Sequence, residues 1–185
     1  MTTQLDAILA APHDADALGA LLTSETIDGL LHDAGLPFED ERSPRVADAL
    51  GRVIWLFDAR SRRDFRPAVM KKGRVVTPAS NGPLDARYER VMLARLKLLA
   101  HRVEHSDDAM PQTVLNIAFR ALGPMPSDAI ATLAERIFAL HGDRTGERLS
   151  LAEALFSFTE PLPPIVATLR DALVRRAEDE GWVEV

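Results

Sequence analysis

The stretch from Ser43 to Arg60 reads SPRVADALGRVIWLFDAR and is the clearest helix signal in the sequence. Its apolar side chains recur every three or four residues, the spacing that places them on one face of an α-helix. The serine and proline predict the helix start, because a serine hydroxyl accepts a free backbone N–H and proline is tolerated in the first turn. The face that we expect to be buried consists of Val46, Leu50, Val53, Ile54 and Phe57.

The same spacing of apolar residues continues along most of the chain in both directions from this helix. Proline, glycine and aspartate interrupt it at intervals of helix length. The longest uninterrupted pattern covers residues 84 to 106. The sequence therefore predicts an all-α fold, a compact bundle of about seven to nine helices. Short strands are expected only near residues 74–77 and 182–185.

The composition is that of an ordered globular chain. The 185 residues are 46% hydrophobic and 27% charged, which differs from the polar, highly charged composition of disordered proteins. The sequence has no cysteine, so disulfides and thiolate metal sites are excluded. The first residues lack the features of a secretory signal, and no apolar stretch has the length of a membrane span. We therefore expect a cytoplasmic protein without membrane contact.

The net charge of -6 is distributed unevenly along the chain. Residues 1–41 carry nine acids and no base, residues 42–102 carry fifteen bases and five acids, and residues 103–185 carry seven bases and fourteen acids. Such segregation can create a directional surface for an anionic partner. Alternatively, the three blocks neutralise one another once the chain is folded. The sequence leaves both possibilities open.

A basic segment, residues 60–74, overlaps the longest stretch without helical periodicity, residues 62–83. It contains seven bases against one acid, Asp64. Arginine and lysine attract phosphates and Phe65 can stack on a base, so one interpretation is nucleic-acid binding. The other is docking on acidic residues of the same chain or of a neighbouring copy. The bases expected to make the contacts are Arg60, Arg62, Arg63, Arg66, Lys71, Lys72 and Arg74.

Residues 101–105 read HRVEH and have the spacing H-x-x-E-H. This pentapeptide resembles the zinc motif of the inverzincin metalloproteases. The resemblance implies that His101 and His105 bind zinc while Glu104 acts as a general base. The helical pattern, however, puts both histidines on a face whose other side chains are cations, which repel a metal ion. The alternative is two solvated histidines near a helix C-terminus, and we predict no metal site and no cofactor.

Residues 127–185 read as a helix, a shorter helix, a turn, a long helix and a final segment GWVEV. This order resembles a winged-helix module, in which the third helix leads through glycine into a short apolar strand. The long helix begins with apolar residues and ends with acids, unlike a helix that reads DNA. The resemblance therefore implies a protein-docking module with Trp182 in its contact surface. The alternative is a plain pair of packed helices with Trp182 as a terminal plug.

Together these features predict a helical body over residues 1–125 and a helical, winged-helix-like lobe over residues 126–185, joined in one compact unit. No catalytic set is recognisable, so we expect a non-enzymatic interaction or adaptor protein, or a small subunit of a larger assembly. The expected partner is another protein or a second copy, bound through the basic segment and the apolar C-terminal segment. The alternatives are a nucleic-acid-binding or regulatory protein and, third, a metal-dependent hydrolase.

Overall fold

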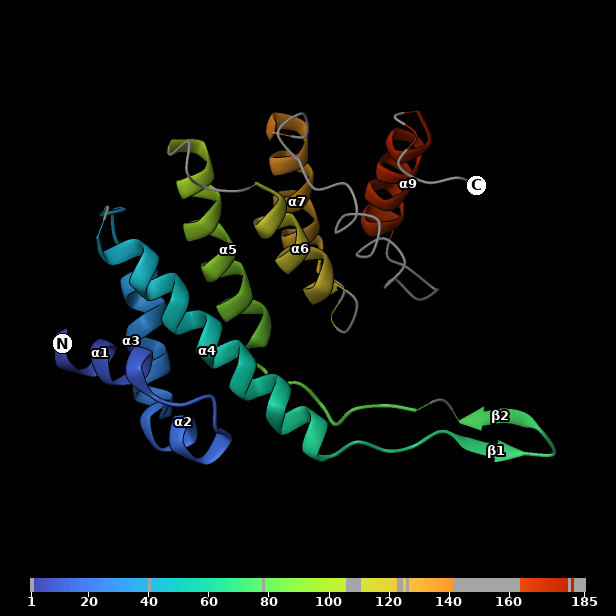
Figure 1. The fold of residues 1–185 in the computed structure, drawn as a ribbon, viewed down its shortest axis with the longest axis horizontal. Coiled ribbons are helices and arrows are strands. Elements are labelled where there is room, and N and C mark those ends of the chain that lie inside the picture. The colour runs from blue at the N-terminus through green and yellow to red at the C-terminus, as the bar shows by residue number, and fades with distance from the viewer. Residues whose placement is uncertain are drawn as a thin grey trace. The chain divides into compact units, whose positions relative to one another are not determined.

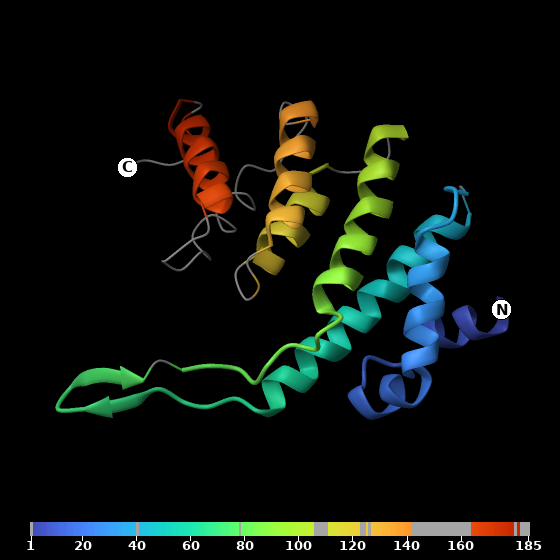
Figure 2. The ribbon, with the colours of Figure 1, turned by 180° about the vertical axis from the view of Figure 1, so that it is seen from behind.

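The computed structural model is all-α, as the sequence predicts (Figures 1 and 2). It describes residues 2–39, 41–77, 79–105, 111–122, 125, 127–141, 164–179 and 181. These residues form eight helices and one antiparallel sheet of two strands. No helix within these ranges combines the length and the apolar character that crossing a membrane requires. The expected strand at residues 74–77 is confirmed, whereas residues 182–185 lie outside the described part.

The chain divides into two compact units, Met1–Arg95 and Leu96–Val185. The first unit contains α1 (Thr2–Ala10), α2 (Ala15–Leu21), α3 (Ser24–Ala34), α4 (Arg42–Arg63), β1 (Val69–Lys71) and β2 (Arg74–Thr77). Helix α5 (Tyr88–His105) runs across the boundary between the units. The second unit also contains α6 (Pro111–Leu122), α7 (Asp128–His141) and α9 (Pro164–Asp179). The boundary expected near residue 125 falls inside this second unit.

Helix α4 is the centre of the first unit, because α1, α2 and α3 each pack against it. All five residues expected on its apolar face are buried. Ile8 of α1, Leu18 of α2 and Ile27 of α3, the helices that pack against α4, are buried as well, each at most 1% exposed. Burying a side chain of this size contributes about 1.5–3 kcal/mol. The periodicity of the sequence thus identifies the side of α4 on which this core forms.

Ion pairs attach the acidic N-terminal helices to the first half of α4. Arg42 pairs with Asp33 of α3 at 2.8 Å, and Arg45 pairs with Asp6 of α1. Both arginines belong to the positive block of the sequence, and both aspartates belong to the negative block. Part of the charge segregation is therefore neutralised within the first unit.

The start of α4 differs from the prediction. The helix begins at Arg42, and the residue before it, Glu41, makes no capping hydrogen bond with its side chain. Ser43 lies inside the first turn, where its hydroxyl accepts the backbone N–H of Glu39 at 3.0 Å. The prediction of Ser43 as the capping residue was wrong, because the amide that it binds lies before the helix and not within it.

The second unit is held together by helix packing and by one described ion pair between helices. Helix α6 packs against α7, and α7 packs against α9. Phe119 of α6 and Ile130 of α7 are fully buried, while Glu104 of α5 accepts a hydrogen bond from Arg136 of α7 at 2.7 Å. Residues 142–163 lie outside the described part. The winged-helix resemblance, which needs a short helix there, therefore stays a prediction.

Candidate functional site

The basic segment ends one helix and then forms a β-hairpin. The first three of its bases, Arg60, Arg62 and Arg63, lie in the last turn of α4. Residues 65–77, which we call the arm, continue from that helix end and point away from the helices of the first unit (Figures 1 and 2). Within residues 62–83 the strand β2 was expected, whereas β1, with which it pairs in antiparallel fashion, was not.

A two-residue turn forms the tip of the arm. Lys72 and Gly73 both have positive φ angles, 52° and 74°, which are the signs that a type I′ hairpin turn needs. Glycine adopts such an angle without steric cost, whereas lysine does so at some cost. The turn brings Lys71 and Arg74 into direct cross-strand pairing. Three cations therefore gather within four residues at the tip.

The tip has an apolar face and a cationic face. Met70 and Val75 are cross-strand partners, so their side chains emerge on the same face of the hairpin. Lys71 and Arg74 form the adjacent pair, and successive residues of a strand point to opposite faces. The tip therefore presents an apolar pair on one side and a cationic pair on the other.

Five large apolar side chains of the arm are more than half exposed. They are Phe65, Val69, Met70, Val75 and Val76, with exposed fractions of 55, 54, 58, 57 and 60%. A two-stranded hairpin that packs against no helix is only marginally stable in water, and clustered exposed apolar side chains mark interaction sites. Sequence reasoning singled out Phe65 but missed the other four, although the signal was present: Val-Met and Val-Val flank the turn that contains Lys72-Gly73.

Hydrogen bonds fix the base of the arm to the end of α4. The buried Ser61 donates its hydroxyl to the carbonyl of Gly82 at 2.5 Å, and the N–H of Gly82 donates to the carbonyl of Ser61 at 2.8 Å. Two further backbone bonds, of 2.7 and 2.9 Å, join Arg66 and Ser80. A Cβ at position 82 would lie 2.5 Å from the Cβ of Asp64, so only glycine allows this approach. These four hydrogen bonds join the segment that leaves α4 to the segment that returns from the arm, and they thereby set the direction in which the arm leaves α4.

The cations of the arm have no ion-pair partner in the described part of the chain. Arg66, Lys71, Lys72 and Arg74 are all exposed, and none of them pairs with a described carboxylate. Their charge is therefore available to a binding partner. Neutralisation by the acidic N-terminal helices does not reach the arm.

The three bases at the end of α4 are placed differently. Arg63 pairs with Asp16 of α2 at 3.2 Å, but both side chains are largely exposed, and such pairs contribute little to stability. Arg62 donates to the backbone carbonyl of Asp58 at 3.3 Å. The guanidinium of Arg60 lies close to Gly19 of α2. These bases face residues of the first unit, so the predicted contact set divides into a helix-end group and an arm group.

An ion pair holds the chain where it returns from the arm. Arg87 donates from Nε and Nη2 to the two carboxylate oxygens of Asp85 at 3.0 and 3.1 Å. Its guanidinium also lies 5.6 Å from the centre of the Phe57 ring of α4. The hydrogen bond from Arg87, with a smaller contribution from the charge of Arg60, lowers the pKa of Asp85. The ionised carboxylate thus helps to fix the return segment beside α4.

A second set of charged residues lines a cavity of about 650 Å³ beside α4. Burial lowers the pKa of Arg95 and raises the pKa of Asp58. The lining contains two arginines, Arg52 and Arg95, and two aspartates, Asp48 and Asp58. Because these charges balance, the cavity has no excess charge with which to select an ionic ligand. It is a weaker candidate site than the arm.

The histidines of the H-x-x-E-H motif contact each other in α5. The rings of His101 and His105 stack with their centres 4.0 Å apart, and Nδ1 of His105 lies 2.8 Å from the carbonyl oxygen of His101. Glu104 is engaged by Arg136. Within the part of the chain that the structure describes, no three His, Asp or Glu side chains are grouped as metal ligands. The geometry therefore gives the zinc interpretation no support.

Comparison with known proteins adds no further candidate. No protein-family model, curated protein or solved structure matches the chain. Trp182, the expected contact in the C-terminal segment, lies outside the described residues, so its role stays a prediction. The arm is the candidate site on the strength of its own geometry.

Proposed function

We propose that this chain is a non-enzymatic protein-binding module of the cytoplasm, an adaptor or an assembly subunit that inserts its arm into a partner. The observation that carries the proposal is the arm itself. Its base is fixed by hydrogen bonds, its tip is cationic, and its apolar side chains are uncovered. Clustered apolar side chains on an exposed hairpin mark an interaction site, and a partner would bury this hydrophobic area.

The chemistry of the arm favours a protein over a nucleic acid as that partner. Cations alone suffice for phosphate binding, and Phe65 is the one aromatic ring of the arm, whereas its four other exposed apolar side chains, three valines and a methionine, cannot stack on bases. Each apolar side chain that becomes buried contributes about 1.5–3 kcal/mol, and only a protein groove can cover several of them together. The expected partner surface is an apolar groove with carboxylates at its rim.

The proposal is tested by photo-crosslinking at the arm in a native lysate. The crosslinker p-benzoylphenylalanine replaces Met70 on the exposed face of the arm, and in the control it replaces Arg90, an exposed residue of α5. We expect one discrete crosslinked protein at position 70 and none at position 90. Adding Lys71→Glu and Lys72→Glu is expected to reduce that product about tenfold, because like charges then face the partner's carboxylates.

Two results would contradict the proposal. One is equal crosslinking at positions 70 and 90, which indicates non-specific contact. The other is a product that disappears on nuclease treatment, which assigns the arm to nucleic acid. Mass determination of the product identifies the partner.

A further inference from the structure

We infer that the arm docks in an acidic groove of a second copy of this chain, and that two copies exchange their arms in this way. The inference rests on the proposed function, since it takes the arm to be a protein-binding element. It adds the identity of the partner and the surface that receives the arm.

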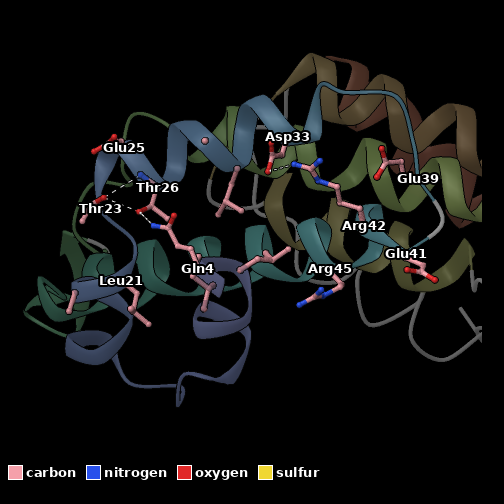
Figure 3. A pocket seen from close by; sticks show the side chains of 15 residues that line it. Gln4, Leu21, Thr23, Glu25, Thr26, Asp33, Glu39, Glu41, Arg42 and Arg45 are labelled. Atoms are coloured by element: carbon pink, nitrogen blue, oxygen red, sulfur yellow. Dashed lines mark hydrogen bonds and ion pairs between the residues drawn. The ribbon is translucent and has the colours of Figure 1, made fainter. Parts of the chain in front are cut away.

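The groove lies among α1, α2, α3 and the start of α4, and it has a volume of about 840 Å³ (Figure 3). Its lining includes the apolar side chains of Leu5, Ile8, Leu21 and Leu30. At one end, Gln4 donates to Thr26 at 2.9 Å, and Thr26 also contacts the hydroxyl of Thr23 at 3.0 Å. These polar groups already bind one another, and the apolar side chains that an incoming chain can reach are chiefly the half-buried Leu5 and Leu21, because Ile8 and Leu30 are buried.

The rim of the groove is negatively charged. Glu25, Glu39 and Glu41 line it, and no ion pair is found for them with any described residue. The two arginines of the lining, Arg42 and Arg45, already pair with Asp33 and Asp6. The groove therefore presents an excess of carboxylates around an apolar interior.

The arm has the complementary pattern. Its four cations lack ion-pair partners in the described chain, and its apolar residues are uncovered. Valine and methionine side chains can cover the leucines of the groove, while Lys71, Lys72 and Arg74 reach its glutamates. Charge complementarity fixes the orientation of this contact, and burial of the apolar side chains of the arm adds to its affinity.

The tip of an arm cannot reach the acidic end of the groove in its own chain. That end, at Glu39 and Glu41, lies at the start of α4, whereas the arm leaves from the end of α4 after Arg63. Eighteen residues of helix separate Arg45 from Arg63, or about 27 Å at 1.5 Å per residue. Seven extended residues from Arg66 to the tip span about 23 Å, and the arm points the other way from its bonded base. The groove that it fits belongs to another molecule.

Reciprocal exchange closes the assembly at two copies. Each chain has one arm and one groove, so two such contacts related by a two-fold axis satisfy both molecules. Fifteen residues line the groove, and thirteen form the arm. Together they fall within the roughly 20–30 residues per partner of a stable protein interface.

Sedimentation velocity over a concentration series measures the self-association. We expect the 20.3 kDa chain to form dimers. Lys71→Glu with Lys72→Glu changes the net charge of the tip, residues 71–74, from +3 to -1, and Glu39→Lys with Glu41→Lys gives a basic groove. Each double variant alone is expected to weaken the dimer about tenfold or more, because both of its contacts then join like charges. Mixing the two variants is expected to restore dimers, since each arm then meets a groove of opposite charge.

Two controls separate this exchange from other effects. Arg90→Glu with Lys97→Glu changes the net charge as much as the arm variant does, at exposed positions of α5, and is expected to leave the dimer unchanged. Gly29→Leu adds a side chain to the groove wall, where a Cβ meets no atom within 4 Å. It is expected to weaken the dimer without altering any charge.

A monomer at all concentrations, a dimer that tolerates all these variants, or a mixture that stays monomeric would overturn the inference. A monomer whose position 70 still crosslinks to a different protein would overturn only the identity of the partner and leave the proposed function standing. Loss of both the dimer and the crosslink removes the proposed function itself.

Discussion

At the scale of single residues, the pair of Asp85 and Arg87 shows how one carboxylate stabilises the junction between the arm and α5. The hydrogen bonds from Arg87 lower the pKa of Asp85 in the folded chain below its ordinary value of 3.8. A carboxyl group with a lowered folded-state pKa stabilises the fold above its unfolded-state pKa. That contribution is lost as the pH falls through the folded-state pKa.

Asp85→Asn is therefore expected to lower the free energy of unfolding by about 1 kcal/mol at neutral pH. The difference from wild type should shrink as the pH falls below about 4, because the wild-type carboxyl group then takes up its proton as well. Urea unfolding at pH 7 and at pH 3 measures both values. The control is Glu135→Gln, an exposed carboxylate of α7, which should change stability by less than about 0.5 kcal/mol at either pH. An Asp85→Asn deficit that is equal at both pH values would contradict the role assigned to its charge.

Some residue-scale features, such as which side chains are buried, follow from the sequence pattern. Others depend on which atoms lie close together in the fold, and the sequence does not show this. The buried face of α4 was predicted correctly because it follows from periodicity alone. The role of Ser43 was not, because its hydroxyl accepts the backbone N–H of Glu39, which lies before the helix. The need for glycine at position 82 was also hidden, since the atom that excludes a side chain belongs to Asp64, eighteen positions earlier.

At the scale of elements, the arm depends on how its base joins α4. Gly82→Ala places a methyl group against Asp64 and the carbonyl of Ser61. We expect a loss of about 1–3 kcal/mol in stability, together with weaker amide protection at Arg66 and Ser80. The matched control is Gly29→Ala in α3, where nothing lies within 4 Å and the change should stabilise by about 0.5–1 kcal/mol. Thermal unfolding and hydrogen exchange measure these effects. Unchanged protection at Arg66 and Ser80 in Gly82→Ala would contradict the anchoring of the arm by its base.

Helices were easier to predict than the hairpin, for a physical reason. A helix of 22 residues repeats its apolar signal over several turns, whereas β1 and β2 have three and four residues. Their turn is Lys72-Gly73, and not the Asn-Gly or Asp-Gly pair that marks most such turns. The apolar residues of the strands also carry no burial pattern, because all of them are exposed. Only β2 was recognisable, from its run of valines.

At the scale of the whole molecule, the charge count could not distinguish an exposed charged surface from charge blocks that neutralise one another within the chain. Both occur, in different parts of the first unit. The acidic N-terminal helices neutralise Arg42, Arg45 and Arg63 on α4, while the cations of the arm have no described partner. The paired arginines lie on α4 beside carboxylates of α1, α2 and α3, whereas the arm leaves α4 and carries its cations away from those helices (Figure 1), and a linear sequence gives no direct measure of that direction.

The overall charge also bears on nucleic-acid binding. A chain with a net charge of -6 repels a polyanion, and the cations of the arm number only four. We expect no mobility shift of single- or double-stranded nucleic acid at about 150 mM salt. Electrophoresis across a salt series tests this, with the Lys71→Glu, Lys72→Glu variant beside wild type. A shift that weakens steeply with salt and vanishes in the variant would favour nucleic acid over protein as the partner of the arm.

The register of the hairpin shifts between the pair Val69–Thr77 and the pair Met70–Val75, and this shift has a consequence for the solution behaviour of the chain. Both strands of the hairpin have a free edge, and a flat free edge is a template on which further strands add without limit, as in amyloid fibres. A bulge twists the edge, and the lysines at the tip repel a neighbouring tip. The hairpin can thus keep an exposed apolar surface for one binding partner, while its twisted edge opposes the edge-to-edge addition of strands from further chains.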